Sequence, residues 1–152
     1  QESIYESARS GSHSTFPERF RIANIPKILK ALSLFKPEVS EAIILDLTSN
    51  AKEPYSDYLK NAVEWRQASP LTRRTFFAQA IAGIKYKLPK RIPCPTLILA
   101  SESDRLVSAQ CSKKIAGAIE ARIVLHPTAG HDLSLDEPKW LAQELKAFFK
   151  PE

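Results

Sequence analysis

The sequence predicts an α/β fold in which short parallel strands are flanked by helices and preceded by a helical region. Residues 96–100 and 122–127 are short apolar runs, and an unbroken apolar run is typical of a parallel strand buried on both faces. An amphipathic segment follows each run, which gives the order strand, helix, strand, helix. With 152 residues, 43% of them hydrophobic, the chain has the size and composition of one globular domain.

Prolines divide residues 25–88 into four predicted helices. Pro26, Pro37, Pro54 and Pro70 each precede an apolar series at helical spacing, and proline suits the first turn of a helix because an N–H would have no partner there. Each series predicts one buried face. The series are Ile25, Ile28, Leu29 and Leu32; Val39, Ile43 and Leu47; Tyr55, Tyr58, Leu59, Ala62 and Val63; and Phe77, Ala80, Ile81 and Ile84.

The remaining segments have clear limits as well. Ser69 is the predicted N-cap of the fourth helix, and Ser108 that of a helix over residues 107–121. The last predicted helix covers residues 136–150, with Asp136 near its N-terminus. Residues 1–24 have few periodic apolar positions and are predicted to be a loop. The predicted buried face of the last helix contains Trp140, Leu141, Leu145, Phe148 and Phe149.

Composition excludes several classes of protein. The net charge is +5 and the pI about 9.3, but lysines and arginines are spread over the whole chain without a recognition motif, so we do not expect a nucleic-acid partner. No run of 18 apolar residues predicts a membrane span. The two cysteines, Cys94 and Cys111, lack metal-site spacing and are predicted to be buried, so we expect a reducing, cytoplasmic location and neither metal nor cofactor.

The two predicted strands bring an acid and a histidine to the same edge of the sheet. Parallel strands joined by a helical crossover end at the same edge, and ligands of open α/β sheets bind there. Asp104 follows the first strand and His131 follows the second. A carboxylate that accepts from a histidine ring N–H fixes the tautomer and stabilises the imidazolium. Asp104 and His131 are therefore the candidate catalytic residues, as the acid and base of a triad.

Other residues in the two loops have simpler interpretations. Glu102 is a rival for the acid, and His126 ends a strand, where a packed or surface ring is expected. Asp132 and Asp136 are expected to accept hydrogen bonds in the loop or at a helix N-terminus.

Two segments resemble the closing part of α/β-hydrolases: "CPTLILASESDRLVS" and "AGHDLSLDEPKWLAQELKAFF". The resemblance covers about residues 89–150. It implies that Asp104 is the triad acid and His131 the base, and that the chain is the C-terminal part of an α/β-hydrolase fold. It further implies a loop over residues 1–24, a helical cap-like region over 25–68, and a core segment over 69–152 with the order helix, strand, helix, strand, helix. In a cap, most aromatic side chains would belong to the core and a few would line an acyl pocket: Tyr55, Tyr58, Trp65, Phe76 and Phe77.

The nucleophile of that family is missing. Its serine lies in a G-x-S-x-G turn, and no two of the four glycines here have that spacing. Ser12, beside His13, is another candidate nucleophile, but the sequence around it predicts no strained turn and no third group. The oxyanion-hole residues are missing too. Because the chain also contains no Met, we expect a piece of a longer protein that begins after the nucleophile, which is a serine or, as in dehalogenases, an aspartate.

Two functions follow. In the first, the chain is part of a hydrolase for an ester or similar acyl substrate; its partner is the N-terminal half of the same hydrolase, and the isolated chain is inactive. In the second, it is a non-enzymatic module of helices and a βαβα unit that binds a protein through its apolar surface. In either case the edges of a two-stranded sheet need covering, which predicts pairing into a homodimer.

Overall fold

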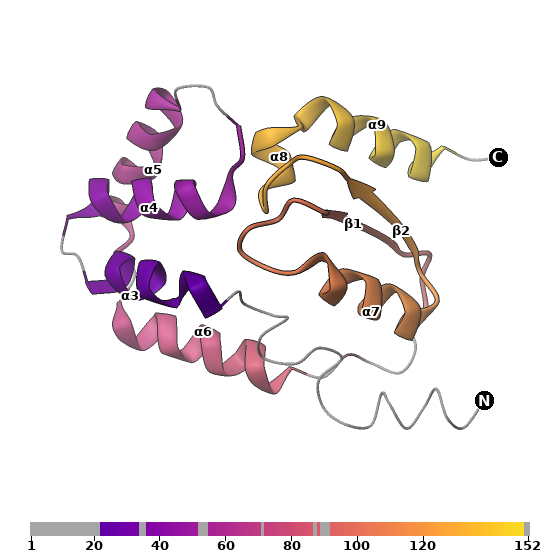
Figure 1. The fold of residues 1–152 in the computed structure, drawn as a ribbon, viewed down its shortest axis with the longest axis horizontal. Helices are drawn as coiled ribbons and strands as arrows, with labels where there is room; N and C mark the ends of the chain where they lie inside the picture. Colours follow the sequence, from indigo (N-terminus) through magenta and orange to yellow (C-terminus); the bar gives the residue numbers. More distant parts are fainter. Residues whose placement is uncertain are drawn as a thin grey trace.

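The computed structural model describes residues 22–33, 36–51, 55–70, 72–86, 88 and 92–150, arranged as a helical half and an α/β half (Figure 1). Ser12, His13 and most of the predicted N-terminal loop lie outside these residues. None of the described helices is both long enough and apolar enough to cross a membrane.

The helical half contains the four predicted helices. Pro37 occupies the first turn of the second helix, as expected from its fixed φ angle. A short 3-10 helix, η1, precedes the first, and α4 packs against both α3 and α5. The bounds are Ile22–Asn24 for η1, Ile25–Ser33 for α3, Pro37–Thr48 for α4, Ser56–Ala68 for α5 and Arg73–Lys85 for α6.

The start of α6 differs from the prediction. Ser69 was the predicted N-cap, but its backbone N–H instead donates to the Trp65 carbonyl and ends α5. Thr72 is the N-cap, and its Oγ1 accepts a hydrogen bond from the Thr75 backbone N–H at 3.1 Å. Thr72 takes this position because its hydroxyl satisfies one of the free N–H groups of the first turn.

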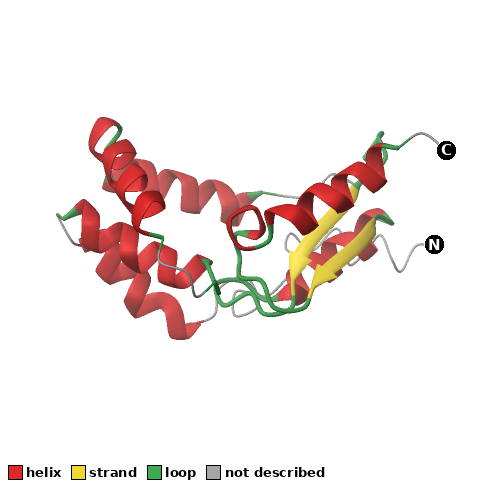
Figure 2. Cartoon of the chain, turned by 90° about the horizontal axis from the view of Figure 1, so that it is seen from above, coloured by secondary structure: helices red, strands yellow, loops and turns green. Residues whose placement is uncertain are grey.

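The α/β half is a βαβα unit. Strands β1 (Leu97–Ser101) and β2 (Arg122–His126) pair in parallel, with Leu97 opposite Arg122 and Ser101 opposite His126. Helix α7 (Ala109–Ile119) connects them and is capped by Ser108, as predicted. It covers one face of the sheet, while α9 lies over the other (Figures 1 and 2). The predicted last helix is two helices, α8 (Leu133–Asp136) and α9 (Pro138–Phe149).

The described residues form only a small core. The buried apolar residues are Leu47, Cys111, Ala116 and Ala129. Burial of Cys111 confirms the prediction, whereas the prediction for Cys94 is wrong, since this thiol is exposed in the turn before β1.

Several faces that were predicted to be buried are exposed. Trp65 of α5 and Phe149 of α9 have exposed fractions of 67% and 74%. Periodicity shows which face of a helix is apolar, but burial also requires a neighbour, and the described part of the chain places none there. The predictions of buried side chains are therefore wrong for Leu29, Val39, Tyr58, Trp65, Phe77, Ile81, Leu145 and Phe149.

Candidate active site

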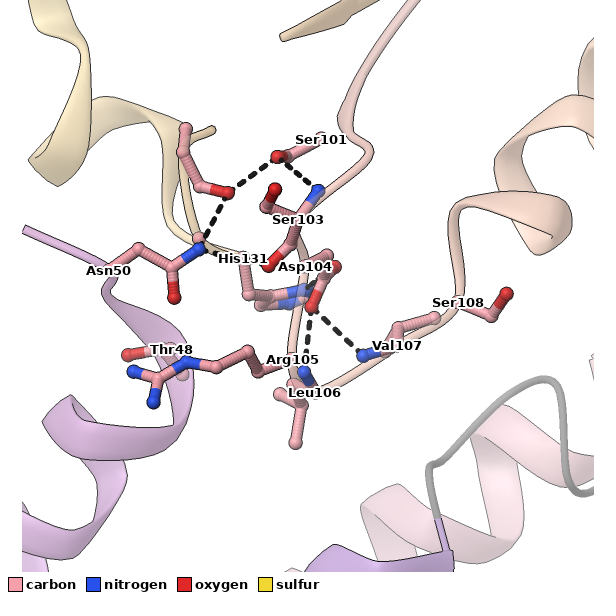
Figure 3. A network of polar contacts seen from close by, with 12 residues as sticks. Thr48, Asn50, Ser101, Ser103, Asp104, Arg105, Leu106, Val107, Ser108 and His131 are labelled. Atoms are coloured by element: carbon pink, nitrogen blue, oxygen red, sulfur yellow. Dashed lines mark hydrogen bonds and ion pairs between the residues drawn. The ribbon is translucent and has the colours of Figure 1, made fainter. Parts of the chain in front are cut away.

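The site lies at the carboxyl ends of β1 and β2, where the structure brings the two predicted residues together. Nδ1 of His131 lies 2.8 Å from Oδ2 of Asp104 (Figure 3). Asp104 is buried, with 12% of its side chain exposed, whereas 44% of the His131 side chain is exposed. The carboxylate is therefore enclosed by protein while the imidazole remains open to a reactant.

Backbone hydrogen bonds fix the Asp104 carboxylate. Its Oδ1 accepts from the backbone N–H groups of Leu106 at 2.8 Å and Val107 at 2.9 Å (Figure 3). Burial by itself raises the pKa of Asp104, but the hydrogen bonds from His131 and from these two N–H groups outweigh it and lower that pKa below 3.8. Asp104 is thus an anion aimed at the ring.

The same contact determines the state of His131. The hydrogen bond to Asp104 raises the pKa of His131 above 6.5, and the smaller effect of burial opposes it. In the neutral ring, a proton held at Nδ1 by Asp104 leaves the lone pair on Nε2. The pair can therefore accept a proton at Nε2 and stabilise the resulting imidazolium.

We predict that this pair makes stability depend on pH. The pKa of His131 is raised above 6.5 by folding, so its contribution is complete below pH 6.5 and is lost as the pH rises through the folded pKa. The pKa of Asp104 is lowered, so its contribution is present above pH 3.8 and is lost as the pH falls through the folded pKa. The contribution is greatest between those two values. Because His131 is nearly half exposed, we expect only about 1 kcal/mol.

The measurement is the free energy of unfolding by urea from pH 3 to 9 for the wild type and Asp104→Asn. The asparagine keeps an oxygen for the two backbone N–H groups of the loop but loses the charge. The difference between the two proteins should be largest near pH 5 and shrink above pH 6.5. A difference that is constant with pH would show that the two groups are not coupled.

The neighbouring candidates lie elsewhere. Glu102 is exposed in the turn after β1, and its backbone N–H donates to the His126 carbonyl. The Nδ1 atom of His126 accepts from the Ala129 N–H at 3.0 Å, and its ring packs edge-on against Trp140 at 4.9 Å. His126 thus has the packed position expected for it.

Sequence reasoning missed the role of Asp136. It was predicted to accept at the N-terminus of the last helix, but it is the last residue of α8, Glu137 is the N-cap of α9, and the Asp136 carboxylate reaches the α4–α5 loop instead. Oδ2 accepts from the backbone N–H groups of Asn50 at 2.8 Å and Gly130 at 2.5 Å, and Oδ1 accepts from the Ser49 hydroxyl. Asp132 does cap a helix, α8, by accepting from the Leu135 N–H.

A pocket of about 440 Å³ lies between the helical half and the loop that follows β1. Its volume is within the range of small-molecule sites. It is lined by Ala42, Leu45, Asp46, Ser49, Asn50, Ala51, Tyr55, Leu59 and Arg105. Among the described ranges, no three His, Cys, Asp or Glu side chains are grouped in a way that would hold a metal ion.

Comparison with known proteins gives the fold. A 2-hydroxy-6-oxo-6-phenylhexa-2,4-dienoate hydrolase from Rhodococcus sp. strain RHA1 matches with a TM-score of 0.63 and 15% identity, over 91% of this chain and 52% of its own. The carboxylesterase CesB of Bacillus subtilis matches with a TM-score of 0.55 and 14% identity, over 96% and 55%. An α/β hydrolase from a Medee basin deep-sea metagenome matches with a TM-score of 0.53 and 20% identity, over 99% and 62%.

These matches confirm the predicted fold class, the C-terminal part of an α/β-hydrolase fold, since nearly all of this chain superimposes on part of each protein. The chain spans little more than half the length of these structures. No protein-family model matches it, and neither does any curated sequence.

Proposed function

We propose that the chain is the C-terminal half of an α/β-fold hydrolase that acts on an ester or similar acyl substrate. The observation that carries this is the 2.8 Å contact between His131 and Asp104 at the carboxyl edge of the two strands, within a fold shared with esterases and hydrolases. In this assignment residues 25–68 are a cap-like region and residues 69–152 the core segment. A cytoplasmic location fits the free thiols of Cys94 and Cys111.

The proposed mechanism uses each feature of the pair. Nε2 of His131 takes the proton of a serine hydroxyl as the serine oxygen bonds to the acyl carbon, and then gives that proton to the leaving alkoxide. Water repeats the sequence to release the acid. Asp104 keeps the ring oriented and balances the charge on the imidazolium. If the nucleophile is an aspartate, His131 activates the water of the second step instead.

The proposal places the nucleophile and the oxyanion hole in an N-terminal half. That half would also cover the exposed apolar faces of α5, α6 and α9, which include Trp65, Phe77 and Phe149. The pocket beside Arg105 is the proposed site for the acyl group, since Leu45 and Leu59 supply apolar surface and Tyr55 an aromatic wall.

The test is hydrolysis of p-nitrophenyl acetate. We expect the chain alone to give no turnover above background, because an acid and a base have no acyl-transfer route without a nucleophile. Coexpression with the segment encoded upstream should restore turnover, and His131→Ala should remove it. Turnover by the chain alone that His131→Ala abolishes would place the nucleophile inside this chain and contradict the assignment.

The exposed apolar surface also favours the second candidate, a non-enzymatic module that binds a protein partner or a second copy of the chain. The upstream coding sequence separates the two functions. A G-x-S-x-G turn, or its aspartate counterpart, in the segment before Gln1 supports the hydrolase, and its absence supports the module.

A further inference from the structure

The side chain of Asn50 connects the two loops that carry the acid and the histidine. Its Nδ2 lies 2.9 Å from the Ser103 carbonyl oxygen, 3.1 Å from that of Thr128 and 3.0 Å from that of Ala129 (Figure 3). Ser103 directly precedes Asp104, and the other two carbonyls belong to the turn that leads to His131. One amide group therefore binds both loops at the same point, with its two N–H groups shared among three acceptors.

Asn50 is itself held in place, because the segment from Thr48 to Asn50 is hydrogen-bonded to the loop that carries His131 and to Asp136. Its backbone N–H donates to Asp136, which also accepts the N–H of Gly130. The Thr48 carbonyl accepts from the Asp132 backbone N–H at 2.9 Å, on the other side of His131. Asp132 is thus bonded directly to the end of α4, and Gly130 is joined to the loop that follows α4 through the Asp136 carboxylate.

A second contact holds the acid loop against the same segment. The Arg105 guanidinium donates to the carbonyls of Asp46 and Ser49, both at 2.6 Å. Since Arg105 follows Asp104, the acid has a bond to the helical half on each side: Asn50 at residue 103 and Arg105 at residue 105. The two loops are therefore held in place by more than the hydrogen bond between Asp104 and His131.

We propose that Asn50 is a positioning residue for the Asp104–His131 pair: its amide ties the loop after β1 to the loop after β2, so that the helical half sets the geometry of the pair. This inference rests on the proposed function for its catalytic meaning. Without the amide, the carbonyl oxygens of Ser103, Thr128 and Ala129 lose a donor. The hydrogen bond from the Ser103 hydroxyl to the Pro127 carbonyl still joins the two loops, but the pair loses the link to the helical half that both loops share.

The experiment compares Asn50→Leu with Asn61→Leu in the full chain. Leucine has nearly the shape of asparagine and no donor. Asn61 is an exposed residue of α5, so its variant makes the same change away from both loops. The readout is the pKa of His131 from the pH dependence of its ring signals in NMR spectra, with circular dichroism as the check on folding. The other charge that acts on His131 is the carboxylate of Asp132, which neither variant alters.

We expect the pKa of His131 in Asn50→Leu to fall towards 6.5, because the loop no longer holds Asp104 against the ring, while Asn61→Leu keeps the wild-type value. If Asn50→Leu does not fold, Asn50→Ala, which leaves room for a water molecule, provides the same comparison. A folded variant with lower stability but an unchanged His131 pKa would overturn the proposal, since Asn50 would then be structural alone.

The outcome is independent of the proposed function, because no substrate is used. If the pKa of His131 responds to Asn50 but removal of His131 leaves ester turnover of the coexpressed halves intact, the positioning role stands and the hydrolase assignment fails. If His131 is essential but its pKa does not respond, the hydrolase assignment stands and the positioning role fails.

Discussion

Asp104→Asn should reduce the kcat of the proposed complete hydrolase by about 10⁴-fold, the size of effect known for removal of the acid from a Ser-His-Asp triad. The asparagine fits the same space and still accepts from the N–H groups of Leu106 and Val107. Its amide, however, presents a donor or a neutral oxygen to the His131 ring in place of a carboxylate. The His131 ring then loses the partner that fixes its tautomer and the negative charge that balances the imidazolium.

The matched control is Glu102→Gln. Glu102 is an exposed carboxylate in the same loop, and the charges that act on His131 are those of Asp104 and Asp132. It should change kcat by less than twofold. The assay is kcat at saturating p-nitrophenyl ester over a range of pH for the chain coexpressed with its upstream half. Equal losses in the two variants would show that general loop charge, rather than the Asp104–His131 contact, supports turnover.

The Asp104–His131 contact could be predicted from sequence because few geometric steps lead to it. Two short apolar runs separated by one helix dictate a parallel pair, and a parallel pair places the residues that follow each strand at one edge. The structure has both strands within one residue of the predicted positions and the two side chains 2.8 Å apart. The fold class and the helix order were equally accessible, since each depends on local periodicity.

The contacts around Asn50 and Asp136 had no such signal. These residues are 86 positions apart, and neither has a pattern that selects the other. Asp136 ends the short helix α8 and accepts hydrogen bonds from the α4–α5 loop, and nothing in "LSLDEP" separates a one-turn helix from the first turn of a longer one. A carboxylate near a helix start is an N-cap by local rules, and only the tertiary arrangement gives it a different partner.

Burial failed as a prediction for a related reason. The helical stripes are real, as the helices α3, α4, α5 and α6 show. An apolar helix face favours burial, but whether Phe77 or Trp65 is buried depends on which segment packs against it. In the proposed hydrolase those faces are the surface that the N-terminal half would occupy. The sequence therefore identified correctly which helix faces are apolar, but the prediction that these faces are buried in this chain was wrong.

Gly130→Ala should destabilise the chain by about 2–4 kcal/mol, because the junction of the two halves leaves no space for a methyl group. A Cβ at this position would lie 2.5 Å from the Thr48 carbonyl oxygen, 2.9 Å from the Asn50 nitrogen and 2.9 Å from Oδ2 of Asp136. Two of these three atoms belong to the backbone, so relief requires a shift of the α4–α5 loop or of the His131 loop. Either shift breaks the hydrogen bond from the Gly130 N–H to Asp136.

Gly117→Ala is the matched control with the opposite sign. Gly117 lies in α7, and among the described residues a Cβ there would meet no atom within 4 Å apart from its chain neighbours and the backbone of its own helix. Alanine favours a helix over glycine by about 1 kcal/mol, so this variant should be more stable than the wild type. The measurement is the free energy of unfolding by urea, followed by circular dichroism. Destabilisation by both variants, or by neither, would contradict the view that Gly130 is required by the close approach of Thr48 and Asn50 rather than by backbone freedom.

The pKa of His131 provides a second measurement on the same two variants. If the loop moves as a unit with Gly130, the pKa of His131 should fall in Gly130→Ala and stay unchanged in Gly117→Ala.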